Sequence, residues 1–188
     1  MKKGILIFAL IFIISVVAFA DHPDGWGVGI MGRGGYGYGH GGLGGFAVSL
    51  KAPMLPIYWG INLDFYRNYF GIGIAGDYYL IDNNITEFGS STLGWYFGVG
   101  GFLGYGSYSP SGASWTSLAI GARAPVGLSF QLPLDSLTLE VFGALVPNLG
   151  LGFWFWSSKH DDYWKDEDRG RVGLVGGVGG ELGVRLWF

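Results

Sequence analysis

Cysteine is absent from the 188 residues, and its absence excludes two kinds of exported protein. A lipoprotein carries its lipid anchor on a cysteine, and a small disulfide-rich secreted domain is stabilised by paired cysteines. Neither is available here. Long apolar runs are also missing after the first 20 residues. The rest of the chain therefore offers no transmembrane helix, which needs roughly 20 apolar residues in a row.

Charged side chains are scarce, and basic ones are nowhere concentrated. Only 13% of the residues are charged and the formal net charge is −3. Binding of nucleic acid needs clustered lysine and arginine, so we expect no nucleic-acid partner. The three histidines, His22, His40 and His160, have no serine partner in a recognisable hydrolase motif. The sequence predicts a protein that is not an enzyme and holds no metal or cofactor.

Apolar, aromatic and glycine residues make up most of what is present. The chain is 49% hydrophobic and 18% aromatic, and it contains 37 glycines. Such a composition would be poorly soluble if it formed an ordinary water-facing surface. Since no spanning helix is available, the remaining way to satisfy every backbone hydrogen bond in a bilayer is a closed β-barrel.

The first 20 residues have the features of a cleaved secretory signal peptide. Lys2 and Lys3 precede an apolar run over residues 5–17, and residues 18–20 form a small-x-small cleavage site. A retained membrane helix over residues 4–20 is the alternative. Cleavage would leave residues 21–188 as one domain, with nine lysines and arginines against 14 acidic residues, hence a formal charge of −5.

The last 18 residues show a strict alternation of two kinds of side chain. Counting back from Phe188, every second residue is apolar or glycine, while the residues between include Arg171, Glu181, Arg185 and Trp187. Side-chain character that alternates with a period of two residues over this length is typical of a β-strand with one apolar and one polar face.

Eight such alternating segments can be placed along the mature chain. Most have the length that a tilted strand needs to cross a bilayer, roughly 9–11 residues. The sequence therefore predicts an all-β, eight-stranded, antiparallel, up-and-down transmembrane β-barrel. The predicted strands are residues 25–32, 43–51, 57–66, 70–81, 93–105, 118–131, 137–151 and 171–188.

The charged residues of these strands all fall on the predicted inner face. An outward arginine at mid-bilayer would cost about 2–4 kcal/mol. Since eight strands enclose a lumen that side chains can fill, we expect the charges to neutralise one another there; a gated narrow conduit is the alternative. Pro125 and Pro147 predict β-bulges. The predicted lumen charges are Lys51, Asp64, Asp77, Arg123, Glu140, Arg171, Glu181 and Arg185.

The connections between strands suggest an orientation. With both chain ends on the periplasmic side, the inner turns are residues 52–56, 82–92 and 132–136, and the second is longer than such a turn should be. The outer connections are then residues 33–42, 67–68, 106–115 and 152–170. Tryptophans on the strands are interpreted as bilayer-interface residues. They are Trp59, Trp95, Trp115, Trp154, Trp156, Trp164 and Trp187.

Two outer connections carry candidate binding residues. The first is rich in glycine and aromatic side chains, and the last holds the acidic clusters 159–162 and 166–168. The acidic loop could hold Ca²⁺ or a basic partner, or be a solvated loop tip; residues 153–156 could form an aromatic binding surface. An omptin-like protease site is attractive there, but the chain is too short for ten strands. The candidate residues are Tyr36, Tyr38, His40, His160, Asp161, Asp162 and Trp164.

The arrangement resembles small eight-stranded outer-membrane barrels of the OmpA/OmpX type, and is most similar to the spirochaete-type small outer-membrane β-barrel family. The resemblance is carried by residues 121–128 (GARAPVGL), 139–141 (LEV), 146–151 (VPNLGL) and the glycine-rich terminal strand. It implies a structural protein or an adhesin for host extracellular proteins. It also implies that Phe188 belongs to the signal read by the barrel-assembly machinery.

Taken together, the sequence predicts a monomeric outer-membrane barrel, in contact with lipid, that has a structural role and an adhesin role through its loops. A narrow channel or a barrel that transports a hydrophobic ligand is the alternative and would need a continuous cavity. A soluble, lipocalin-like secreted barrel is a third hypothesis, and it requires the opposite arrangement, with apolar residues facing inward.

Overall fold

The computed structural model describes residues 22–38, 45–66, 68–109, 113–158 and 169–188, and almost all of them lie in β-strands. The predicted all-β fold is confirmed. In the part of the chain that the structure describes, no helix is long and apolar enough to cross a membrane. The strands are β1 (Gly27–Tyr38), β2 (Gly45–Lys51), β3 (Tyr58–Tyr66), β4 (Tyr69–Phe88), β5 (Ser91–Tyr108), β6 (Ala113–Arg123), β7 (Val126–Leu134), β8 (Leu137–Ser158) and β9 (Arg169–Trp187).

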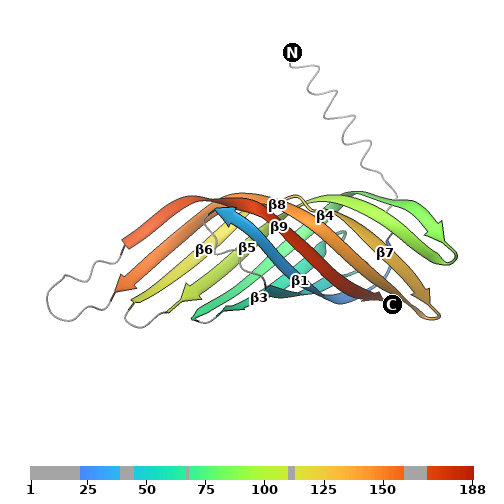
Figure 1. Cartoon of the computed structure of the whole chain (residues 1–188), viewed down its shortest axis with the longest axis horizontal. Helices are drawn as coiled ribbons and strands as arrows, with labels where there is room; N and C mark the ends of the chain where they lie inside the picture. Colours follow the sequence, from blue (N-terminus) through green and yellow to red (C-terminus); the bar gives the residue numbers. More distant parts are fainter. Residues whose placement is uncertain (1–21, 39–44, 67, 110–112, 159–168) are drawn as a thin grey trace, which may run out of the picture.

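The strands form one closed antiparallel ring (Figure 1). β1 pairs with β9 from Gly27 opposite Trp187 to Tyr38 opposite Gly176, so the first and last strands close the seam. β6 and β7 are two parts of a single interrupted strand, because both pair with β5 on one side and β8 on the other. The ring therefore has eight positions connected in chain order, which confirms the predicted eight-stranded up-and-down barrel.

The interruption between β6 and β7 lies at Ala124 and Pro125. The nitrogen of Ala124 donates to the carbonyl of Pro147 at 3.0 Å, and the carbonyl of Pro125 accepts from the nitrogen of Gly98 at 2.8 Å. The pairing on either side continues without an extra residue. The bulges predicted at Pro125 and Pro147 were therefore wrong: each proline lacks an N–H, but the neighbouring residues keep the ladder in step.

Bulges occur instead in β4, which is longer than predicted. The pairing with β5 shifts between Tyr79 and Ile81 and again between Asn84 and Thr86. The strand continues to Phe88 and turns at Gly89, whose φ of 65° is a left-handed conformation that favours glycine. The predicted long turn over residues 82–92 was wrong, because most of it extends the β4/β5 hairpin.

The connections lie at two ends of the barrel. The end that we call the terminal end holds residues 22–26, Phe188 and the short β2–β3, β4–β5 and β7–β8 connections; the opposite end is the loop end (Figure 1). β1 and β8 reach further toward the loop end than predicted, to Tyr38 and Ser158. The connections predicted to begin at residues 33 and 152 therefore start only after these strands.

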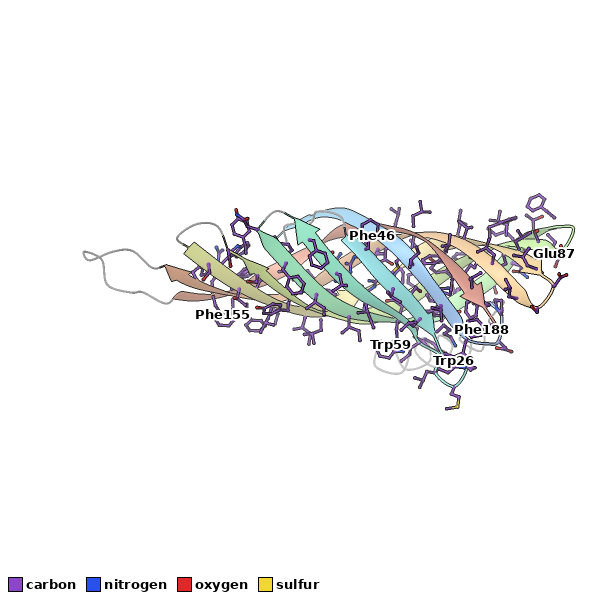
Figure 2. All side chains as sticks on the ribbon, turned by 90° about the horizontal axis from the view of Figure 1, so that it is seen from below. Trp26, Phe46, Trp59, Glu87, Phe155 and Phe188 are labelled. Carbon is purple, nitrogen blue, oxygen red and sulfur yellow. The ribbon has the colours of Figure 1, made fainter. Side chains whose placement is uncertain are left out.

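The outer surface is a continuous apolar face. Phe46, Ile120 and Leu182 are 77%, 54% and 67% exposed, although all three are large hydrophobic residues. Figure 2 shows side chains projecting outward along the whole length of the barrel, with Phe46 and Phe155 among them. An apolar surface of this extent needs an apolar medium or a partner to cover it.

Four of the predicted interface tryptophans, Trp115, Trp154, Trp156 and Trp187, belong to the inner face of their strands. Trp187 is only 2% exposed and lies inside the barrel. Trp154 also points inward, where its ring lies beside the glycines at positions 152 and 173. Glycine makes room for aromatic rings in the narrow lumen, and at Gly127 an added Cβ would lie 2.6 Å from the ring of Tyr96.

Candidate functional site

A buried hydrogen-bond network closes the terminal end of the lumen. Glu140 on β8 is fully buried, and its Oε2 accepts bonds from Arg185 Nη1 and from Trp187 Nε1, both at 2.7 Å. Arg185 also donates to Ser49 Oγ at 2.8 Å. Because charge-assisted bonds of this kind are strong and hold side chains in one geometry, they fix β2, β8 and β9 to one another across the lumen.

His22 is the residue that completes this network. It lies ahead of β1 and is 5% exposed. Its Nδ1 lies 2.6 Å from Asp82 Oδ1, and its Nε2 lies 3.0 Å from Glu140 Oε1. A histidine that donates from both ring nitrogens is the protonated form. Burial lowers the pKa of His22, but the hydrogen bonds to Asp82 and Glu140 outweigh it and raise the pKa from 6.5 to about 9.

Aromatic rings surround the network. Tyr79 stacks between Tyr58 and Tyr96, with ring centroids 3.9 Å and 4.4 Å away. The edge of His22 meets Tyr58 at 5.5 Å, and the guanidinium of Arg185 lies 4.5 Å from the ring of Phe142. We call these rings, together with His22, Asp82, Glu140, Arg185 and Trp187, the terminal plug. Its rings are closely packed and its charges are paired, so the plug fills this end of the lumen with buried side chains.

A second charge cluster lies nearer the middle of the barrel. Arg123 on β6 reaches Asp77 on β4, with Nε and Oδ1 2.9 Å apart. Its Nη2 donates to Glu181 Oε2 on β9, also at 2.9 Å. Because the three residues belong to strands that are not neighbours, the contacts run across the lumen. We call this triad the central layer.

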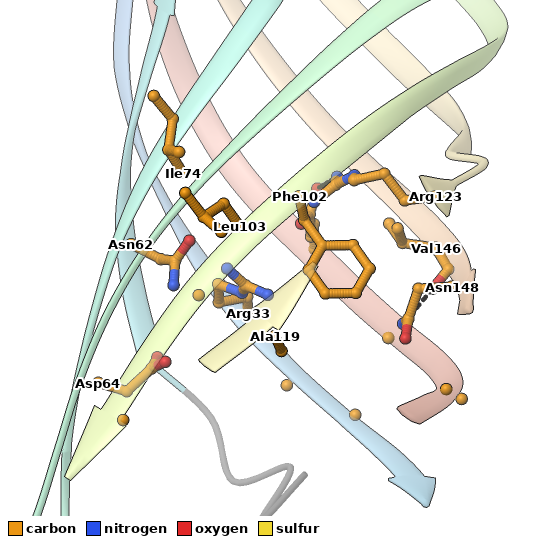
Figure 3. Close-up of a pocket in the computed structure, with 18 of the residues that line it drawn as sticks. Arg33, Asn62, Asp64, Ile74, Phe102, Leu103, Ala119, Arg123, Val146 and Asn148 are labelled. Atoms are coloured by element: carbon orange, nitrogen blue, oxygen red, sulfur yellow. Dashed lines mark hydrogen bonds and ion pairs between the residues drawn. The ribbon is translucent and has the colours of Figure 1, made fainter. Parts of the chain in front are cut away.

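Beyond the central layer the lumen opens into a cavity of about 180 Å³ toward the loop end (Figure 3). Its wall includes Arg33 on β1, Asn62 and Asp64 on β3, and Asn148 on β8, together with several glycines of β9. The lumen is therefore divided into a closed terminal half and an open half at the loop end.

The predicted lumen charges take different places. Asp77, Arg123, Glu140, Glu181 and Arg185 belong to the two clusters, and Asp64 lines the cavity. Lys51 lies at the terminal end, where its Nζ donates to the carbonyl of Ala52 at 3.0 Å. Arg171 lies opposite Trp154 near the loop end and is exposed, so it joins neither cluster.

Sequence reasoning missed His22 and Asp82. Asp82 was predicted to lie in the turn over residues 82–92, since the preceding strand was predicted to end at residue 81. Continued alternation from Asp77 would place residue 82 on the outer face. The bulge between Tyr79 and Ile81 reverses the faces and turns Asp82 inward. His22 had no strand pattern around it. The available signal was a short His-Pro-Asp segment directly before the first strand.

The predicted loop candidates are mostly outside the described residues. This holds for His40, His160, Asp161, Asp162 and Trp164. The backbones of Tyr36 and Tyr38 continue β1 and pair with Val178 and Gly176, so these two residues are not in a loop; their side chains are outside the described part. Phe188 follows β9, and its side chain points outward. Within the described ranges no group of histidine and acidic residues has the arrangement of a metal site.

Comparisons with known proteins give little further information. No family description matches the sequence, and no curated protein matches it. Among solved structures, the fold is similar to the crystal structure of a major outer membrane protein from Thermus thermophilus, at 15% identity and a TM-score of 0.49, over 89% of this chain and 100% of that chain. A likeness at this identity and TM-score does not indicate a function.

Proposed function

We propose that this protein is an outer-membrane β-barrel with a structural role in the cell envelope. The observation that carries the proposal is the sorting of side chains around a closed ring: large apolar residues face outward, and the ion-paired charges face inward. A soluble ligand-binding barrel has the opposite arrangement. Every described strand also pairs with a neighbour on each side, and the stretches paired on one side only, such as β4 beyond Asp77, lie at the ends of the barrel. A sheet within a bilayer requires this closure.

The lumen supports a closed barrel rather than a pore. Two successive clusters of paired charges cross it, and the terminal plug is lined by stacked tyrosines. A hydrophobic-ligand transporter would need a continuous apolar cavity, and the described lumen is interrupted by Arg123 and by Arg185. The paired charges are not a catalytic arrangement, and we propose that the protein is not an enzyme.

The cellular route and partners follow from the same proposal. We infer export through a signal peptide over residues 1–20, and insertion by the barrel-assembly machinery through the terminal strand that ends in Phe188. Outer-membrane lipid would surround a monomer, with the loop end at the cell surface. A relation to the small spirochaetal barrels, and adhesion to a host extracellular protein through the connections that follow β1 and β8 at the loop end, belong to this proposal and are supported by the sequence pattern alone.

Conductance of the refolded protein in planar lipid bilayers tests the closed lumen. We expect essentially no current from the wild-type barrel, because the terminal plug and the central layer fill its cross-section. A double variant, Arg123→Ala with Glu181→Ala, should also remain closed, since the terminal plug is untouched. Stable unitary currents from correctly folded wild-type protein would contradict the structural role and favour a narrow channel.

A further inference from the structure

The cavity at the loop end is a blind pocket of small-molecule size. A water molecule takes about 30 Å³ of the liquid, so a cavity of about 180 Å³ has room for a compact organic molecule. Its floor is the Arg123–Glu181 pair of the central layer. The closed floor distinguishes this cavity from a conduit, because a solute that enters from the loop end has no way through.

Arg33 and Arg123 are the two arginines that line this pocket. Arg123 is ion-paired, whereas Arg33 makes no ion pair with a described side chain. Its cross-strand neighbour on β9 is Glu181. The Oε2 of Glu181, however, accepts from Arg123. The guanidinium of Arg33 lies instead near the middle of the cavity, in the space between Asn62 and Phe102 (Figure 3). A guanidinium in such a position presents its donors to whatever fills the pocket.

Glycine keeps the pocket empty. At Gly104, a wall residue on β5, an added Cβ would have no atom within 4 Å. A Cβ therefore fits at this position without a clash, so the glycine leaves space that a side chain could enter.

We propose that this pocket binds a small organic monocarboxylate, with the carboxylate on Arg33. Arginine pairs with carboxylates through two parallel hydrogen bonds. Asn62 lies next to Arg33 and Asn148 lines the opposite side of the cavity, so both supply amide groups, while Phe102 and Val146 supply an apolar wall for the rest of the ligand (Figure 3). The acidic Asp64 and Glu181 border the same space, so a doubly charged anion such as phosphate meets more repulsion than a monoanion does.

Titration of para-fluorobenzoate into the purified barrel, followed by fluorine NMR in non-ionic detergent micelles, tests this proposal. We expect saturable binding beyond that of empty micelles. Arg33→Gln should weaken it about tenfold or more, as the loss of a charged hydrogen-bonding partner does. Gly104→Leu should weaken it similarly by filling the pocket. Inorganic phosphate should not displace the probe.

Two matched variants separate a site from a general change in charge or stability. Arg171→Gln removes the same charge from an exposed position outside the pocket, and Gly32→Leu makes the same exchange on the outer face. Both should bind the probe as the wild type does. Folding of each variant is checked by circular dichroism before titration.

Three results would overturn the proposal. They are no saturable binding by folded wild-type protein, equal affinity in Arg33→Gln, and displacement by phosphate at a concentration similar to that of the probe. The inference rests on the proposed closed barrel, but the two fail separately. If the wild-type protein conducts ions, the closed lumen is contradicted whether or not the probe binds. If it does not conduct and the probe does not bind, only the carboxylate site is contradicted.

Discussion

Replacing Glu140 by alanine should lower the free energy of unfolding by about 3–5 kcal/mol, the range seen when one partner of a buried ion pair is removed. The carboxylate is fully buried and holds Arg185, Trp187 and His22 at once. Without it, the guanidinium of Arg185 stays buried, and among the described side chains Ser49 is its remaining hydrogen-bond acceptor. Urea unfolding in phospholipid vesicles, followed by tryptophan fluorescence, measures the change.

A double-mutant cycle tests whether the loss comes from the pair. Arg185→Met alone should also be costly, since it leaves Glu140 without its strongest partner. Combined with Glu140→Ala, it should cost clearly less than the sum of the two single changes, because no unpaired charge remains. Glu87→Ala at the exposed tip of the β4/β5 hairpin is the control (Figure 2). A Glu140→Ala loss no larger than that of the control would show that the terminal plug does not stabilise the barrel.

The stability of the barrel should fall as the pH rises through the pKa of His22. The folded-state pKa of about 9 is above the ordinary value of 6.5, so the protonated form is favoured by folding. Its contribution is fully present below about pH 6.5 and disappears as the pH passes about 9. The difference between the two pKa values corresponds to about 3 kcal/mol.

The variant His22→Asn isolates this contribution. It keeps hydrogen-bonding capacity but has no titratable proton, while every other titrating group is shared with the wild type. The difference in unfolding free energy between the two proteins should therefore be large at about pH 6 and small at about pH 10. A difference that stays constant over this range would mean that His22 is not held as a cation between Asp82 and Glu140.

The alternation of side chains was enough to predict the barrel. Residues such as Ile61, Asn62 and Leu63 fall on alternate faces as their order predicts, because a strand in a closed ring has only two sides. Length and turn residues then limited the number of strands to eight. The extension of β4 was not predicted, because residues 83–88 are mostly polar or charged and do not form an apolar face.

The partners inside the lumen could not be predicted in the same way. Arg123, Asp77 and Glu181 come from strands that are not adjacent, so their contacts depend on the width and stagger of the ring, which alternation does not encode. Asp82 was hidden by a one-residue bulge that reversed its face. His22 was hidden because a segment without regular structure has no periodicity to interpret.

The opposite faces of two neighbouring residues on β5 give the most direct test of the barrel. The chain has no cysteine, so Leu103→Cys and Gly104→Cys each introduce a single site for a bimane label. Leu103 is exposed on the outer face, and Gly104 lines the cavity. In vesicles of brominated lipid, the label at position 103 should be strongly quenched and the label at position 104 should not be. Equal quenching at both positions, or quenching only at position 104, would contradict a barrel whose apolar face meets the bilayer.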